Sequence, residues 1–269
     1  MVARKSITAI YNSIGDGYDV TRKADPEIVS TLADMIRPSL HGEYLDVACG
    51  TGNYTTVLSA LGGNWSAIDQ SEVMLANARP KSDSVSWYLM DAMKLEFSSN
   101  FFDGSTCTLA IHHFPEIDLP FREIARVLKP GARFAILTAF PTQMMRYWLT
   151  EYFPGMMEKA CEQMPDREQV ISSLSRAGLI VEEFRPFEIT PELQDFFLYS
   201  GKQRPEIYLS ESVRAGISSF RNGFCDPEEL RDGLARLERD IAGENISNVM
   251  KRYSHNDGDY MFILARKPV

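Results

Sequence analysis

Cysteine is scarce in this sequence. The chain has four cysteines among 269 residues, and no two of them form a C-x-x-C pair. Such isolated cysteines argue against a zinc site, or any other metal site, and against a disulfide framework. The sequence therefore predicts a protein of a reducing compartment. The four residues are Cys49, Cys107, Cys161 and Cys225.

Long apolar runs are also missing. No stretch approaches the roughly 18 apolar residues that a membrane span requires, and no apolar core of a signal peptide follows Arg4 and Lys5. We therefore expect a soluble, cytoplasmic protein without a membrane partner.

Basic residues are fewer than acidic residues. The chain has 28 Lys and Arg against 37 Asp and Glu, a net charge of −9, and it has no basic run. This balance argues against binding to duplex nucleic acid, whose phosphates attract cationic surfaces. Hydrophobic residues make up 44% of the chain and charged residues 24%, which suits a folded core rather than disorder. The expected partner is a small molecule, and the expected state is a monomer or homodimer.

The first half alternates short apolar runs with helical patterns. This alternation predicts a parallel sheet with crossover helices. One helix is expected after Asp25, because Pro26 follows this N-cap residue and Ile28, Leu32 and Ile36 recur on one face. A second helix is expected from an N-cap at Asp118 to the stop at residues 129–131. The predicted strands are Glu43–Ala48, Asn64–Asp69, Val85–Met90, Gly104–Ile111 and Ala132–Thr138.

In the second half of the chain, the alternation of short apolar runs and helical patterns stops. Two late strands are predicted, Leu179–Ile189 and Asp259–Arg266, with residues 190–257 mostly helical between them. An insertion of this length in a compact domain is usually functional or an interface. We interpret it as a helical cap within one domain of residues 1–269.

The sharpest local signal is a glycine loop after the first strand, Tyr44 to Tyr54, with the sequence YLDVACGTGNY. Gly50 and Gly52 permit positive φ angles and close approach of a ligand. A dinucleotide fingerprint would need a third glycine at Thr55, so a dehydrogenase is disfavoured. Two further strands end in carboxylates. Asp69 is placed to accept both hydroxyls of a ribose, and Asp91 to accept from an adenine amino group or to make a solvated turn.

These motifs resemble, in order, those of class I S-adenosylmethionine-dependent methyltransferases. The resemblance rests on residues 46–52, Asp69, residues 91–92, 102–103 and 128–131, and covers about residues 5–140. It departs at Ala48, where the family usually has a glycine. It implies a Rossmann-like α/β fold of seven strands in the order 3-2-1-4-5-7-6 with the last antiparallel, S-adenosylmethionine as cofactor and S-adenosylhomocysteine as product. The implied cofactor-binding residues are Tyr18, Arg22, Asp46, Ala48, Cys49, Gly50, Thr51, Gly52, Asp69, Gln70, Met74, Asp91, Ala92, Met93 and Ala110.

The N-terminal segment, residues 1–24, is expected to be a lid over the cofactor. Arg22 is placed to pair with the methionine carboxylate, and Tyr11 or Tyr18 to lie beside the sulfonium. The alternative is an amphipathic start whose aromatic rings only cover apolar surface. Tyr11 is also taken as a substrate contact, together with Tyr199, Tyr208 and Phe220 of the insertion.

Two histidines, His112 and His113, follow the fourth strand at the edge where open α/β sheets bind ligands. One of them, with a slight preference for His113, is expected to act as a general base or to orient the substrate, with a pKa near the operating pH. The alternative is packing under the loop. The favoured activity is methyl transfer to a small-molecule acceptor. Other readings are alkyl transfer or cyclisation of the same cofactor, or a cofactor-binding module without catalysis.

Overall fold

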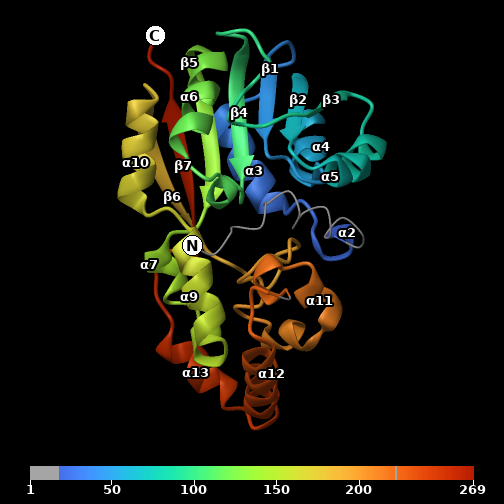
Figure 1. Cartoon of the computed structure of the whole chain (residues 1–269), viewed down its shortest axis with the longest axis vertical. Helices are drawn as coiled ribbons and strands as arrows, with labels where there is room; N and C mark the ends of the chain where they lie inside the picture. Colours follow the sequence, from blue (N-terminus) through green and yellow to red (C-terminus); the bar gives the residue numbers. More distant parts are fainter. Residues whose placement is uncertain (1–17, 222) are drawn as a thin grey trace.

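The computed structural model describes residues 18–221 and 223–269. Its centre is a seven-stranded sheet in the order β3-β2-β1-β4-β5-β7-β6 (Figure 1). Strand β7 is antiparallel to both β5 and β6, and the other pairs are parallel. The predicted fold and strand order are therefore confirmed. The strands are β1 Glu43–Val47, β2 Asn64–Asp69, β3 Val85–Leu89, β4 Phe102–Thr108, β5 Leu128–Thr138, β6 Ile180–Phe187 and β7 Tyr260–Arg266.

Helices cover both faces of the sheet. α3 (Pro26–Ile36) and α4 (Asn53–Ser59) pack on one face, α6 (Asp118–Val127) and α10 (Arg167–Arg176) on the other, and α5 (Glu72–Ala78) lies against β2 and β3. The predicted start of α3 is confirmed, because the Asp25 carboxylate accepts from the backbone of Glu27 and Ile28.

Three local predictions are wrong. Strand β5 begins at Leu128 rather than at Ala132, so residues 129–131 end α6 by entering the sheet rather than by forming a turn. The N-cap of α6 is Ile117 rather than Asp118, because the Asp118 carboxylate instead binds Ser173 and Arg176 of α10. Strand β4 ends at Thr108 rather than at Ile111, because Leu109 has a φ of 54°, which turns the chain out of the sheet. Residues Ile111–His113 form the short 3₁₀ helix η2 instead.

A second body of helices lies beyond the carboxyl end of the sheet (Figure 1). We call it the helical region, residues 141–163 and 190–257. Its second part is the predicted insertion, but the connection from β5 to β6 also contributes to it. Its elements are α7 Pro141–Met144, α8 Leu149–Tyr152, α9 Pro154–Gln163, η3 Pro205–Leu209, α11 Glu211–Ala215, η4 Ser218–Phe220, α12 Pro227–Ala242 and α13 Ile246–Arg252.

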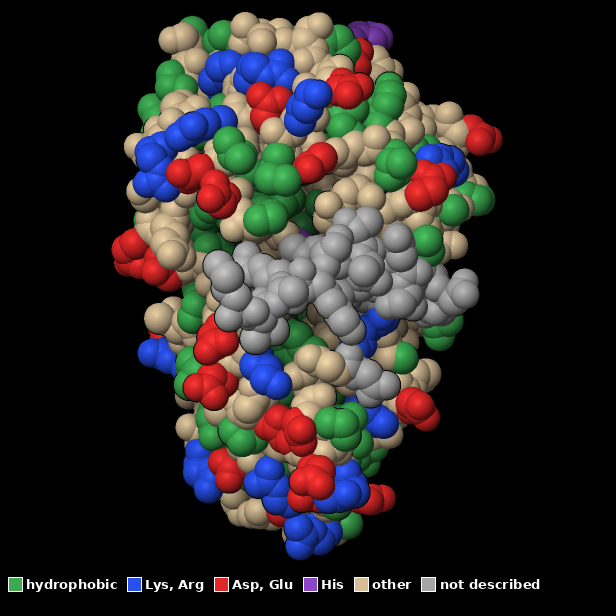
Figure 2. Space-filling model, viewed as in Figure 1, with side chains coloured by type: hydrophobic (Ala, Val, Ile, Leu, Met, Phe, Trp, Pro, Cys, Tyr) green, Lys and Arg blue, Asp and Glu red, His purple; other side chains and the backbone are tan. Residues whose placement is uncertain are grey.

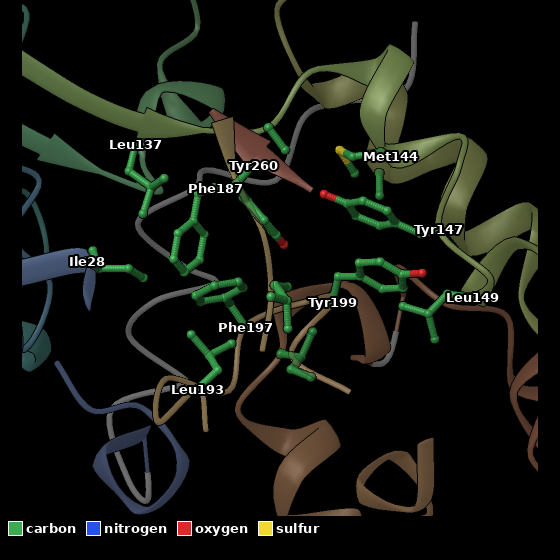
Figure 3. Packing of buried hydrophobic residues seen from close by; sticks show 14 of the residues in the cluster. Ile28, Leu137, Met144, Tyr147, Leu149, Phe187, Leu193, Phe197, Tyr199 and Tyr260 are labelled. Atoms are coloured by element: carbon green, nitrogen blue, oxygen red, sulfur yellow. The ribbon is translucent and has the colours of Figure 1, made fainter. Parts of the chain in front are cut away.

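Aromatic side chains join the helical region to the sheet. Phe187, Phe197 and Tyr260 gather at the sheet end, and the rings of Tyr147 and Tyr199 stack beside them with centroids 3.9 Å apart (Figure 3). One continuous apolar cluster therefore runs from one sheet face into the helical region. On the visible surface, acidic and basic side chains are interspersed (Figure 2). Among the described helices, none is both long and apolar enough to cross a membrane.

Candidate active site

The candidate site lies at the carboxyl edge of the sheet, where the chain turns after β1 to β4. The glycine loop that follows β1 is strongly bent. Ala48, Gly50 and Gly52 have φ angles of 57°, 56° and 72°. A Cβ built on Gly52 would lie 2.3 Å from Cη2 of Trp87, whereas a Cβ on Gly50 would have no atom of residues 18–221 or 223–269 within 4 Å. The loop is therefore packed from below at Gly52 and open above Gly50.

Asp69 ties the end of β2 to this loop. One carboxylate oxygen accepts the Gly50 N–H at 2.9 Å, and the other accepts the Ser71 N–H at 2.8 Å. Burial raises the pKa of Asp69. Ser71 is the N-cap of α5, so Asp69 is not needed as a cap. Its position beside the open side of Gly50 suits an acceptor for a ligand hydroxyl.

Asp46 lies beneath the loop rather than on its surface. Its carboxylate is buried and accepts from the hydroxyls of Thr55 and Thr106. Desolvation raises the pKa of Asp46 to about 6, against the lowering effect of the two hydroxyls. In this arrangement Asp46 holds α4 against β4.

The end of β3 forms a turn around Asp91. The exposed carboxylate accepts from the Met93 N–H at 2.9 Å, which is the solvated turn considered as the alternative above. Gln70 is exposed, Met93 is half-buried, and Met74, Ala92 and Ala110 are buried around the site.

Helix α2 (Tyr18–Thr21) is bound to the glycine loop through Asp19. The Asp19 carboxylate accepts from Thr51 Oγ1 at 2.7 Å and from Asn53 Nδ2 at 3.1 Å, and forms an ion pair with Lys81 at 2.6 Å. Lys81 also donates to the Thr51 carbonyl. Sequence reasoning missed Asp19, Asn53 and Lys81. Tyr11 and the side chain of Tyr18 lie outside the described residues.

Arg22 forms an ion pair that the sequence did not predict. Its guanidinium binds the Asp195 carboxylate through Nε and Nη2, and Tyr54 donates to the same carboxylate at 2.9 Å. Asp195 belongs to the segment after β6 and is 1% exposed. No local pattern could have singled out Asp195, because 173 residues separate it from Arg22.

His112 and His113 lie together in η2, with ring centroids 3.9 Å apart. Burial and the positive charge of Arg22 lower the pKa of His112 to about 4. Burial, then His112 and Arg22, lower the pKa of His113 well below its usual value. The expectation of a pKa near the operating pH is therefore wrong for this structure. Both imidazoles are therefore neutral at pH 7 and are weaker bases than an ordinary histidine.

The aromatic residues expected to contact substrate are buried in the helical region. The Tyr199 hydroxyl accepts from the Trp148 N–H, and the Tyr208 hydroxyl binds the backbone of Gly201 and Leu198. Phe220 meets Phe153 edge to face. In this structure they form packing contacts.

Cys49, within the loop, is half-buried. Desolvation, followed by the negative charges of Asp46 and Asp69, raises the pKa of Cys49 well above its usual value. The side chain therefore stays a thiol and fills space rather than acting as a nucleophile.

Known proteins share this architecture. A family model described as a methyltransferase domain matches residues 45–136. A crystal structure from Anabaena variabilis, described as a methyltransferase from an antibiotic biosynthesis pathway, is 31% identical. It covers 91% of this chain and 98% of its own, with a TM-score of 0.80. The chain belongs to the class I S-adenosylmethionine-dependent methyltransferases. Its activity is methyl transfer to a small-molecule acceptor.

Two other similarities bear on this methyltransferase. The demethylmenaquinone methyltransferase of Corynebacterium glutamicum is 28% identical over 257 residues, which are 89% of this chain and 95% of that protein. The crystal structure of the cyclase SpnF has a TM-score of 0.56 over 98% of this chain and 93% of its own, at 20% identity. That second likeness shows a shared fold alone.

Proposed function

We propose that this methyltransferase binds S-adenosylmethionine at the carboxyl edge of the sheet, with the ribose on Asp69. The observation that carries the proposal is the pairing of an open Gly50 with a carboxylate bound to its N–H. A ligand chain passing over Gly50 would meet no side chain of the described residues, and the Asp69 carboxylate has lone pairs left to accept from ligand hydroxyls. The remaining predicted cofactor residues are proposed as its lining, with Asp46 as a support beneath the loop.

When bound, the cofactor supplies a methyl group already activated by a sulfonium. The protein's part is to align the acceptor and exclude water. We infer that the neutral imidazole of His113 or His112 orients the acceptor by hydrogen bonding. The burial and the nearby charge of Arg22 that keep the imidazoles neutral also disfavour the imidazolium that proton uptake would form. The pair therefore suits an orienting role better than that of a general base.

We place the acceptor between the histidine pair and the helical region, which would act as its cap. α2 would close the other side, since Asp19 already binds the glycine loop. The name of the Corynebacterium relative suggests a demethylated quinone as one acceptor to test.

Calorimetry with S-adenosylhomocysteine tests the cofactor assignment. Asp69→Ala should weaken binding by about 1–3 kcal/mol, because a buried acceptor for two hydroxyls is lost. The matched control is Asp103→Ala at the opposite edge of the sheet, where the carboxylate also accepts a backbone N–H, that of Glu43. Equal affinity in the Asp69 variant would refute the assignment. A screen of acceptors with labelled methyl donor, read by mass spectrometry, separates methyl transfer from alkyl transfer or cyclisation.

A further inference from the structure

A buried carboxylate joins three parts of the chain that are distant in sequence. Asp195 receives hydrogen bonds from Arg22, just after α2, and from Tyr54, in the first turn of α4. Asp195 itself lies in the helical region. Its side chain is 1% exposed and that of Arg22 is 15% exposed, so water does not screen the pair.

This contact belongs to a longer set of contacts between residues 193–196 and residues 21–25, which we call the seam. The Phe196 N–H donates to the Thr21 carbonyl at 3.0 Å, and the Gln194 N–H donates to the Asp25 carboxylate at 2.9 Å. Residues 193–196 therefore run along residues 21–25. Any movement of this part of the helical region away from α2 would break the seam and the carboxylate contacts together.

The seam lies next to the reacting groups. Arg22 lowers the pKa of both His112 and His113, so its charge is close to the histidine pair. Its backbone carbonyl accepts from Asn53 of the glycine loop at 2.9 Å. Two hydrogen bonds from one planar guanidinium to one carboxylate fix its orientation as well as its distance.

We propose that Asp195 is a positioning residue for methyl transfer, which orients Arg22 toward the cofactor's methionine carboxylate and holds the helical region on the cofactor loop through Tyr54. This inference rests on the proposed function, because it takes the cofactor to lie over Gly50. Asp195 does not touch the reacting atoms. Its effect on the reaction passes through Arg22 and Tyr54.

A double-mutant cycle on S-adenosylhomocysteine affinity tests the proposal. Asp195→Asn keeps the shape but removes the charge, and should raise the dissociation constant about tenfold. In an Arg22→Gln background the same change should alter affinity less than about threefold, because only the contact through Tyr54 remains. Tyr54→Phe, which removes one hydroxyl, should raise the constant about threefold and is the second variant if Asp195→Asn does not fold.

The matched control is Asp240→Asn. Asp240 also accepts a tyrosine hydroxyl within the helical region, that of Tyr152 at 2.7 Å. It should lower thermal stability without changing cofactor affinity. Parental affinity in both Asp195→Asn and Tyr54→Phe, or equal losses from Asp195→Asn in the two backgrounds, would overturn the inference. Failure of the parent protein itself to bind S-adenosylhomocysteine would instead overturn the proposed function.

Discussion

At the scale of single residues, Ala48 shows what the departure from the family glycine costs. Its φ of 57° lies in the left-handed region, where a Cβ is disfavoured by about 1–2 kcal/mol. Ala48→Gly relieves this strain. The glycine also raises the conformational entropy of the unfolded chain, which lowers the free energy of unfolding by about 0.4–1 kcal/mol. We expect a net stabilisation of about 0.5–1 kcal/mol in urea unfolding.

The control for this change is Ala60→Gly, at an exposed position with a φ of −70°. No strain is relieved there, so the variant should be destabilised by up to about 1 kcal/mol. The same sign of change in both variants would contradict the strain argument.

A second residue-scale prediction concerns acid stability. The pKa of His112 falls from its usual 6.5 to about 4 on folding. Between these values the unfolded chain binds a proton that the folded chain does not, so stability falls as the pH falls through this window. The loss due to His112 should approach about 3 kcal/mol.

His112→Gln should therefore gain stability relative to the parent as the pH is lowered from 6.5 to 4. Melting temperatures across that range measure the difference. His41→Gln, at an exposed position, is the control and should follow the parent curve. A constant offset between His112→Gln and the parent would show that burial does not perturb this imidazole.

At the scale of elements, α2 is a four-residue helix that the carboxylate of Asp19 connects to the glycine loop. Asp19→Ala removes the bonds to Thr51, Asn53 and Lys81 at once. Amide exchange in residues 18–22 should become about tenfold faster, because about 1–1.5 kcal/mol of net hydrogen bonding is lost. Exchange within α6 should not change.

The lid prediction adds a second arm to that measurement. Bound S-adenosylhomocysteine should slow exchange in residues 8–23 of the parent. The control for Asp19→Ala is Asp34→Ala, because the exposed Asp34 carboxylate pairs with Arg185 away from the glycine loop. Amide exchange in residues 18–22 should be the same in this control as in the parent. Unchanged exchange on adding the ligand would leave α2 as a fixed part of the scaffold.

At the scale of the whole molecule, one buried ion pair links the helical region to the sheet. Asp259 is fully buried next to β7, and one of its oxygens accepts from Lys202 and from the Ile189 N–H, each at 2.8 Å. Lys202→Met would remove the lysine cation from this carboxylate and leave His255, whose Nε2 lies 4.0 Å from the other carboxylate oxygen, beside it. We expect a loss of about 3–5 kcal/mol in the free energy of unfolding, measured with denaturant.

The control is an exposed pair, Lys129 and Asp103, at 2.7 Å. Lys129→Met should cost at most about 1 kcal/mol, since water screens both charges. Similar costs for the two lysine variants would mean that the buried pair is compensated by other groups.

The sequence and the structure agree where chemistry is local. Asp25 and Pro26 identify the start of α3, and Gly50 and Gly52 identify a loop with positive φ angles, because both depend on neighbours within a few residues. The strand order came from the resemblance to a family. Asp195 and Lys202 could not be predicted, since their partners are fixed only when the insertion folds back onto the sheet. The low pKa of His112 likewise depends on burial by distant segments.

The place of β7 has a consequence for how the chain is made. Among the described strands, β6 pairs with β7 alone, and β7 also pairs with β5. During translation, β6 therefore leaves the ribosome before its partner strand β7 has been synthesised. Until then β5 presents an unpaired edge, which favours aggregation and recruitment of chaperones. Synthesis of the last strand is thus the step that commits the chain to its native sheet.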